Sequence, residues 1–377
     1  MVEDLKRATR FLERDTLTSA LRGAGFDAAV VQSAKNVWYM SGHPRVGSSQ
    51  RPGGPGAALA VGTRDGDSAL VVGRWHSGLA SKLAWSDEVV RFRNFAQSGF
   101  HTVADVLEAK GLARGTIGVE LDYVSDKEYR HLVGAMPEAT FLDLGGLIDE
   151  LRVRKDARQL AESARAYERL ATALLTGLEA SRGGDTRVQI HNRIMREILR
   201  QGTDTGRGGI GAAGQRIVPL VSTQAVPAAR GDALVLDYTC SFGPYAAHIS
   251  RTVVVGAPEA TVADRYARQH EALLASVVSF RPGMPANEAA RSVQERLTAA
   301  GVACPQPVVG HGVSLGFEDM PVLSPASRDR LEPGMEFVVA PRVQGGLMVS
   351  LRCVMTETGV ELSDSGFAVD RPYVLDK

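Results

Sequence analysis

The sequence has few cysteines, no excess of charge of either sign and no long apolar run. Its 377 residues include only three cysteines, Cys240, Cys304 and Cys353, which are far apart and lack CxxC spacing. A small, odd number of scattered cysteines argues against a disulfide framework or a thiolate zinc site and fits a reducing cytoplasm. We expect each thiol to be buried as a small apolar side chain.

The charges balance, at 43 Lys and Arg against 43 Asp and Glu, and the two signs are interspersed along the chain. The chain therefore has no basic stripe to neutralise a phosphate backbone or an anionic membrane. No segment approaches the ~18 consecutive apolar residues of a membrane span, and the first residues are charged. The sequence predicts a soluble, cytoplasmic protein with neither nucleic acid nor membrane as a partner.

The chain is longer than the ~250–300 residues at which a single core stops growing, which predicts two domains, residues 1–150 and 151–377. An amphipathic helix is expected over residues 15–24, ended by Gly25, and a buried strand over 27–32. Further strands are predicted at 57–61, 68–72 and 116–120, and helices at 102–110 and 125–133. Alternating strands and helices indicate an α/β layered first domain.

The second domain is expected to begin with one long amphipathic helix, because apolar residues recur every three to four positions over residues 157–179. A glycine-rich stretch at 202–214 precedes a predicted hairpin, in which residues 233–238 and 249–255 form the strands. Other expected elements are helix 188–200, two later helices, the second with Asn287 and Gly301 as its caps, and strands at 336–339 and 347–355. This order predicts an α+β second domain.

The segment 231–237, Gly-Asp-Ala-Leu-Val-Leu-Asp, is followed eleven residues later by His-Ile-Ser-Arg-Thr at 248–252. The pair resembles the signature of the pita-bread family, which includes methionine aminopeptidase, prolidase, aminopeptidase P and creatinase. The segments 310–312, 331–335 and 355–359 agree with the family in order and spacing, and the first half resembles its prolidase-type domain. The resemblance implies a pita-bread catalytic domain preceded by a creatinase/prolidase-type α/β domain.

Hydrolases of that family bind two divalent metals through Asp, Asp, His, Glu and Glu. The resemblance places the first Asp at Asp237 and the His at His311, whereas the other three positions hold His248, Ala340 and Ser350. Two neighbouring dications need bridging carboxylates to offset their repulsion, which one carboxylate and two imidazoles do not provide. The resemblance therefore implies a chain without the dinuclear metal site, and we expect no metal and no other cofactor.

The remaining departures from the family also fall on its pocket, where two substrate-facing histidines are replaced by Leu220 and Glu318. The leading catalytic candidate is His248, because an imidazole suits proton transfer at neutral pH and Asp237 can orient it. His311 and Glu318 are further candidates for proton transfer. A purely structural role is also open for both histidines: His248 would fill the vacated metal space, and the Gly-His-Gly turn around His311 would persist for backbone reasons.

Arginines are the leading candidates for binding a substrate carboxylate, because the guanidinium fork matches that group. Arg51 lies in a loop, 45–56, that resembles a creatinase segment reaching across a dimer interface, so a homodimer is expected. Arg342 and Arg352 lie near lost metal ligands, where a cation could replace the metal charge. The other candidates for the pocket lining are Tyr238, Ser250, Ser350 and Asp319.

The leading functional hypothesis is a metal-independent enzyme that hydrolyses a non-peptide C–N bond in a small, carboxylate-bearing molecule, as creatinase and ectoine hydrolase do. Leu220, Ser250 and Ser350 stand at the positions that the resemblance assigns to creatinase's own catalytic groups. A lyase, isomerase or cyclase that acts by proton transfer therefore stays open. A mononuclear metalloenzyme using Asp237, His248 and His311 stays open too, as does a non-catalytic binding module.

Overall fold

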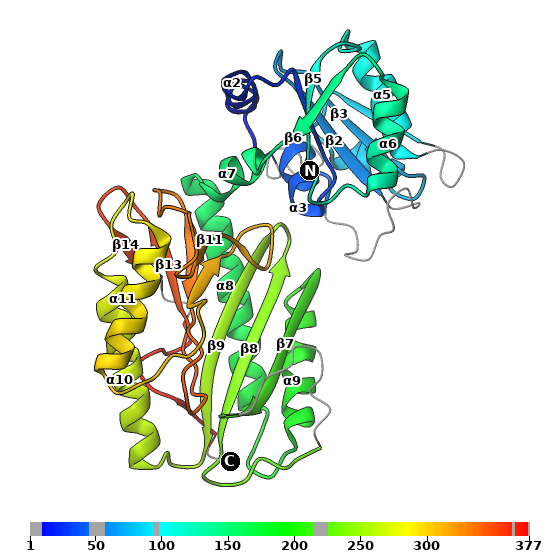
Figure 1. The fold of residues 1–377 in the computed structure, drawn as a ribbon. Helices are drawn as coiled ribbons and strands as arrows, with labels where there is room; N and C mark the ends of the chain where they lie inside the picture. Colours follow the sequence, from blue (N-terminus) through cyan, green and yellow to red (C-terminus); the bar gives the residue numbers. More distant parts are fainter. Residues whose placement is uncertain (1–9, 45–56, 93–97, 215–224, 364–365, 376–377) are drawn as a thin grey trace. The chain divides into compact units, whose positions relative to one another are not determined.

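The computed structural model describes residues 10–44, 57–92, 98–214, 225–363 and 366–375 (Figure 1). The chain divides into two compact units, Met1–Arg152 and Val153–Lys377, and each is described by itself. The loop 45–56 and Leu220 lie outside the described residues.

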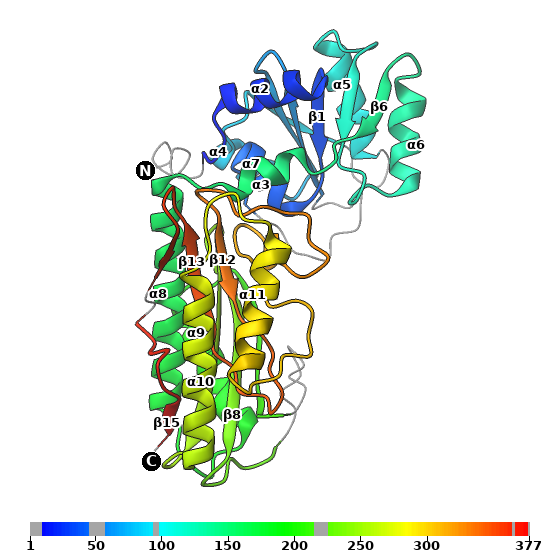
Figure 2. The ribbon, with the colours of Figure 1, turned by 60° about the vertical axis from the view of Figure 1, so that its left-hand side comes forward.

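The N-terminal unit contains a six-stranded mixed sheet in the order β4-β3-β2-β1-β5-β6. The strands are β1 (Ala28–Val31), β2 (Ala58–Thr63), β3 (Ser68–Val72), β4 (Glu88–Arg91), β5 (Thr116–Val119) and β6 (Thr140–Asp143). The helices are α2 (Arg14–Ala24), α3 (Ala34–Ser41), α4 (Ser77–Leu83), α5 (Gly99–Ala109), α6 (Asp126–Ala135) and α7 (Leu147–Val153). Because helices cover both faces of the sheet (Figures 1 and 2), its central strands are continuously buried.

Every strand and helix predicted in this unit is present, and α2 ends at Gly25, which has a left-handed φ of 77°. The sequence did not indicate β4 and β6. These strands form the two edges of the sheet, and most of their side chains are exposed or half-buried. They therefore lack the apolar run that marked the inner strands.

The C-terminal unit consists of two sheets, each flanked by a pair of helices (Figures 1 and 2). The helices are α8 (Ala157–Glu179), α9 (Arg187–Arg200), α10 (Ala260–Val277) and α11 (Ala286–Ala299). The first sheet has the order β15-β9-β8-β7, from β7 (Thr205–Ala212), β8 (Ala233–Phe242), β9 (Tyr245–Val255) and β15 (Tyr373–Leu375). The second has the order β11-β10-β12-β13-β14, from β10 (Gly310–Gly312), β11 (Asp319–Leu323), β12 (Glu336–Val339), β13 (Leu351–Met355) and β14 (Val360–Leu362). An isolated bridge between Arg251 and Val349 ties the two sheets together.

Local sequence explains several of these boundaries. Capping boxes start α8 at Asp156 and α9 at Thr186. Each capping side chain accepts the backbone N–H of a glutamine three residues later, and that glutamine side chain accepts the backbone N–H of the capping residue. The predicted hairpin is confirmed as β8 and β9, which turn at Gly243 with a φ of 62°. The prediction for Asn287 was wrong, because Pro285 is the N-cap of α11. Gly301, with a φ of 70°, follows the C-cap residue as a left-handed terminator.

The glycine-rich stretch 202–214 contains β7, a strand that the sequence did not indicate. The glycines allow close packing on β8: a Cβ added at Gly208 would lie 2.2 Å from the Tyr238 ring. The low β-propensity of glycine hides this strand from pattern analysis, although its neighbours require glycine there.

The three cysteines are free, and Cys240 and Cys353 are buried as expected. Burial raises the pKa of Cys240 to about 12, so this thiol stays protonated at neutral pH. None of the described helices is long and apolar enough to span a membrane.

Candidate active site

The β8–β9 hairpin positions three polar side chains on one face of the first sheet. Asp237 is paired across the hairpin with Ser250, and Thr239 with His248, so the alternation of strand side chains puts Asp237, Ser250 and His248 on the same side. His248 Nε2 lies 2.8 Å from Asp237 Oδ1, and Ser250 Oγ donates to the same oxygen at 2.8 Å. The carboxylate thus has two hydrogen-bond donors on one oxygen.

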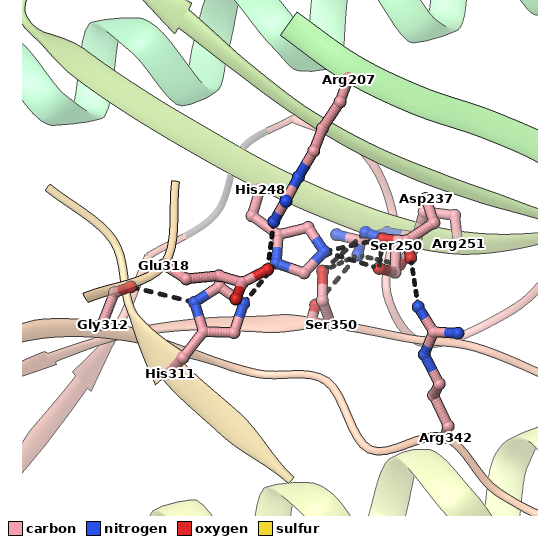
Figure 3. A network of polar contacts seen from close by, with 10 residues as sticks. All are labelled: Arg207, Asp237, His248, Ser250, Arg251, His311, Gly312, Glu318, Arg342 and Ser350. Atoms are coloured by element: carbon pink, nitrogen blue, oxygen red, sulfur yellow. Dashed lines mark hydrogen bonds and ion pairs between the residues drawn. The ribbon is translucent and has the colours of Figure 1, made fainter. Parts of the chain in front are cut away.

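His311 comes from β10 of the second sheet and meets His248 across the site (Figure 3). His248 Nδ1 lies 3.2 Å from His311 Nε2, and the two rings are nearly parallel, with 14° between their planes. The other nitrogen of His311, Nδ1, lies 2.9 Å from the Gly312 carbonyl oxygen. A continuous chain of hydrogen bonds therefore runs from Asp237 through both imidazoles to the Gly312 backbone.

This chain of hydrogen bonds indicates which imidazole nitrogens carry a proton. The Gly312 carbonyl can only accept, so His311 Nδ1 carries a hydrogen and Nε2 of the neutral ring is an acceptor. His248 must then donate from Nδ1 to His311 and from Nε2 to the Asp237 carboxylate. Every hydrogen bond of the network is satisfied when His248 donates from both nitrogens and His311 is a neutral imidazole.

The charge balance around the two imidazoles agrees with this assignment. Burial, reinforced by the neighbouring His248, lowers the pKa of His311 to about 4, so His311 is neutral at neutral pH. Burial by itself would raise the pKa of Asp237. The hydrogen bonds and charge of His248, with the Ser250 hydroxyl and the Arg342 charge, outweigh it and hold the Asp237 pKa well below its usual range. Asp237 is accordingly a carboxylate that accepts a hydrogen bond from His248.

Arginines lie at both ends of the chain of hydrogen bonds. Arg342, beyond β12, donates from Nη2 to Asp237 Oδ2 at 3.1 Å, and its side chain is 46% exposed. At the other end, Arg207 of β7 forms a close ion pair with Glu318, beside His311. Burial would raise the pKa of Glu318, but Arg207 outweighs it and lowers that pKa, so Glu318 is a carboxylate and not a proton donor. Arg207 is a site residue that the sequence did not indicate, because it lies in the glycine-rich β7.

Ser350 forms part of the wall of the candidate site, and its hydroxyl is not placed as a metal ligand. Its Oγ accepts from the Ser250 N–H at 3.0 Å and from Arg251 Nη1 at 3.1 Å. Arg251 Nη1 also donates to the Ser350 carbonyl at 2.9 Å. These bonds join β9 to the segment before β13 directly beside His248.

Two predicted pocket residues lie elsewhere. Tyr238 is fully buried on the face of β8 opposite to Asp237, where its hydroxyl lies 2.7 Å from His191 Nδ1, so its prediction as a pocket residue was wrong. Arg352 donates from Nε to Glu336 at 2.6 Å, and Glu336 also pairs with Lys155 at 3.2 Å. Arg352 therefore balances a buried carboxylate and does not stand in for a metal beside Asp237.

Asp319 is buried at the start of β11, where its Oδ1 accepts from the Met320 N–H at 3.1 Å, outside the network of Figure 3. Arg51 lies outside the described residues. Its role across a dimer interface, and the homodimer itself, stay predictions.

The donor set does not fit a pair of divalent metals. Ala340 has no ligand atom and packs with the apolar cluster around Val338, and the Ser350 hydroxyl already accepts two hydrogen bonds. Among the described residues, no group of three or more His, Cys, Asp and Glu side chains is arranged to hold a metal ion. Since the two nitrogens of His248 face different partners, the described geometry does not favour a single site on Asp237, His248 and His311 either.

Comparison with known proteins gives the family. Residues 158–365 match metallopeptidase family M24, and residues 14–154 match the creatinase/prolidase N-terminal domain. The chain therefore belongs to family M24, a family of hydrolases built on the pita-bread fold, as the sequence motifs predicted.

The relatives are distant in sequence. An uncharacterized peptidase, YqhT, of Bacillus subtilis is 26% identical over 89% of this chain and 92% of its own length. An ectoine hydrolase of Halomonas elongata is 26% identical over 68% of this chain and 69% of its own. The structure of an Xaa-Pro dipeptidase from Bacillus anthracis superposes with a TM-score of 0.80 at 22% identity, covering 96% of this chain and 99% of that one. This structural likeness supports the two-domain fold.

Proposed function

We propose that this chain is a metal-independent hydrolase that cleaves a non-peptide C–N bond in a small, carboxylate-bearing molecule. The observation that carries the proposal is the hydrogen-bonded chain Asp237–His248–His311, which occupies positions that the family motifs assign to metal ligands. An ion pair of imidazolium and carboxylate can supply a proton where a metal would supply Lewis acidity.

Cleavage of a C–N bond needs a proton on the departing nitrogen, because an amide anion is a very poor leaving group. His248 is protonated on both nitrogens in the network, and Asp237 holds the Nε2 proton. Nδ1 is then the donor atom, 3.2 Å from His311 Nε2. In a hydrolysis the attacking water loses one proton as the nitrogen gains one, so the same pair of imidazoles can serve as acid and then as base.

The two flanking arginines support a substrate with a carboxylate. Arg207 and Arg342 are 37% and 46% exposed, so both reach solvent beside the imidazoles. Each guanidinium has five N–H donors and uses only some of them on its carboxylate partner, which leaves donors for a second, planar anion. Because Glu318 neutralises Arg207, a surplus positive charge lies at the other end, where Arg342 and a protonated His248 share Asp237, and it favours a small anionic substrate.

The test combines metal analysis with a substrate panel. Purified protein is expected to contain far less than one equivalent of Zn, Mn or Co, and to keep its activity after chelation. The panel comprises small carboxylates with amide, amidine or cyclic C–N bonds, ectoine among them, and Xaa-Pro dipeptides with and without added Mn²⁺. We expect turnover in the first group and none of the dipeptides.

Two outcomes would contradict the proposal. Metal that resists dialysis, with activity lost to a chelator and restored by one ion, would indicate a metal-dependent enzyme. Turnover in ¹⁸O-labelled water without label in the product would indicate elimination, isomerisation or cyclisation on the same imidazole pair instead of hydrolysis.

A further inference from the structure

A cavity of about 470 Å³ opens in the C-terminal unit on the helix side of β9 and β13. Tyr167 of α8 and Leu274 of α10 line it, together with Ile249 and Arg251 of β9. Because strand side chains alternate, Ile249 and Arg251 face away from the side chains of His248 and Ser250. This volume lies within the range of small-molecule sites, about 300–1,000 Å³.

The cavity borders the candidate active site without being part of it. His248 and Ser350 contribute to its wall, whereas Asp237, His311 and Glu318 are not among its described lining residues. The bonds from Ser350 to Ser250 and Arg251 close the wall between the two spaces. A ligand in the cavity would therefore lie behind His248, away from the face that meets Asp237.

Two side chains with hydrogen-bond donors, Tyr167 and Arg352, line the cavity side by side. The Arg352 guanidinium lies 4.7 Å from the centroid of the Tyr167 ring. Its Nε and Nη1 donate to Glu336 and Ser363, both at 2.6 Å, and within the described residues its Nη2 has no partner. The Tyr167 hydroxyl is buried near the His248 backbone, yet it makes no well-formed hydrogen bond to any described residue. The unpaired, buried Tyr167 hydroxyl costs stability, so an acceptor between it and Arg352 Nη2 is favoured.

The charged side chains behind the cavity carry a net positive charge. Glu336 is fully buried and is shared by Lys155 and Arg352, so this three-residue cluster has one more cation than anion. Asp370, which is exposed, also lines the cavity, and its charge acts on His270. The excess of positive charge is therefore deep in the cavity, at the Arg352 end.

The rest of the lining is apolar. Leu274, Leu351, Leu362 and Val369 surround the space between the mouth and Arg352. An apolar body with one anionic end satisfies both parts of the lining, because the anion accepts from the two donors and the body covers the leucines.

We propose that this cavity is a second ligand site that binds a small aliphatic monocarboxylate, with the carboxylate on Tyr167 Oη and Arg352 Nη2. Hexanoate has the length to extend from these donors along the leucines. The site is separate from the reaction proposed above and is tested by binding, not by turnover.

Isothermal titration calorimetry of the full chain with hexanoate is the direct test. We expect saturable binding of hexanoate, with hexanamide and hexylammonium at least ~10-fold weaker, because neither offers two anionic acceptor oxygens. Equal binding of the three probes, or a hexanoate Kd above about 10 mM, would overturn the proposal.

Two variants locate the binding. Tyr167→Phe keeps the ring and removes the donor, and is expected to weaken hexanoate binding by about 10-fold. Leu274→Trp fills the cavity from α10 and is expected to abolish binding, whereas Leu199→Trp, at a 65% exposed leucine of α9, is the matched control and should bind as the parent does. If Leu274→Trp does not fold, the test of the site rests on Tyr167→Phe and on the comparison of hexanoate with hexanamide. Parent-like binding by Tyr167→Phe would contradict the assigned donor.

Discussion

Two carboxylates of the C-terminal unit are each held between two nitrogen-bearing side chains, in different surroundings. Glu336 lies between Lys155 and Arg352, and the three side chains are 0%, 1% and 6% exposed. Asp237 lies between His248 and Arg342, and Arg342 is 46% exposed. The first cluster is almost wholly buried, with only Arg352 at the wall of the cavity, and the second is open to solvent.

The side chains that hold the two carboxylates also differ in chemistry. Burial would raise the pKa of both carboxyl groups, and in both cases the neighbouring positive charges outweigh it and lower the pKa. Lysine and arginine keep their protons at neutral pH, whereas histidine exchanges one there. The Glu336 cluster is therefore a permanent structural charge, and the Asp237 cluster can carry out proton transfer. The following predictions test this distinction.

Breaking the buried cluster should cost the most stability. Glu336→Gln leaves Lys155 and Arg352 buried without a compensating anion, and we expect the free energy of unfolding to fall by about 3–5 kcal/mol in urea titrations. Glu361→Gln, at an exposed glutamate of β14, is the control and should change it by less than ~0.5 kcal/mol. A loss below ~1 kcal/mol for Glu336→Gln would mean that the cluster is not structural.

Breaking the open cluster should cost activity instead. His248→Ala and Asp237→Asn are each expected to reduce turnover by ~10²-fold or more, the contribution of a positioned acid or base, with a nearly unchanged melting temperature. His131→Gln, in the N-terminal unit, controls for loss of a histidine. Retained activity in both variants would refute the proton-transfer role, and a large fall in melting temperature would show that His248 mainly fills space.

The pH dependence of stability tests the neutral state of His311. Its folded pKa, about 4, is below the ordinary value of 6.5, so the unfolded chain binds a proton between these values that the folded chain does not. The free energy of unfolding should therefore fall as the pH drops from 6.5 to 4, by about 3 kcal/mol at most from this residue. Asp237, with its lowered pKa, adds a further loss only at lower pH.

His311→Gln should flatten this dependence in urea titrations between pH 4 and 7. Burial also lowers the pKa of His43 in the N-terminal unit to about 4, which gives a loss of the same sign in the same window. The measured quantity is therefore the difference in slope between the parent and His311→Gln. Identical slopes would show that the pKa of His311 is the same in the folded and the unfolded chain.

The sequence predicted the framework of this unit well, because its signals are local. Apolar periodicity located α8 to the residue, and the hairpin motif put Asp237 and His248 on neighbouring strands. The pairing of His248 with His311 joins two sheets, so only the family resemblance could suggest it. The fold prediction thus rested on local pattern, and the hypothesis for the site on family motifs.

The wrong or missed predictions of site residues come from the direction of side chains on a strand and from charged partners that are distant in the sequence. Tyr238 follows Asp237 directly, so strand alternation turns it to the opposite face, a consequence that its sequence position already contained. Arg352 was predicted as a site residue because it is close to Ser350 in the sequence, but it donates to Glu336 on the neighbouring strand. Arg207 was hidden in a glycine-rich strand and reaches Glu318 only through tertiary structure.

The smallest expected effect comes from the exposed arm of the open cluster. Arg342→Gln removes a half-exposed partner of Asp237, so the free energy of unfolding should change by less than ~1 kcal/mol. The pKa of Asp237 should rise, because one of the charges that lower it is lost. We therefore expect the acid end of the stability–pH profile, where Asp237 takes up its proton, to move to higher pH in the variant, and added salt to shift the parent toward the variant. Arg342→Lys keeps the charge and should retain the parent's profile. A profile that is the same in the parent and Arg342→Gln would show that His248 and Ser250 alone set the state of Asp237.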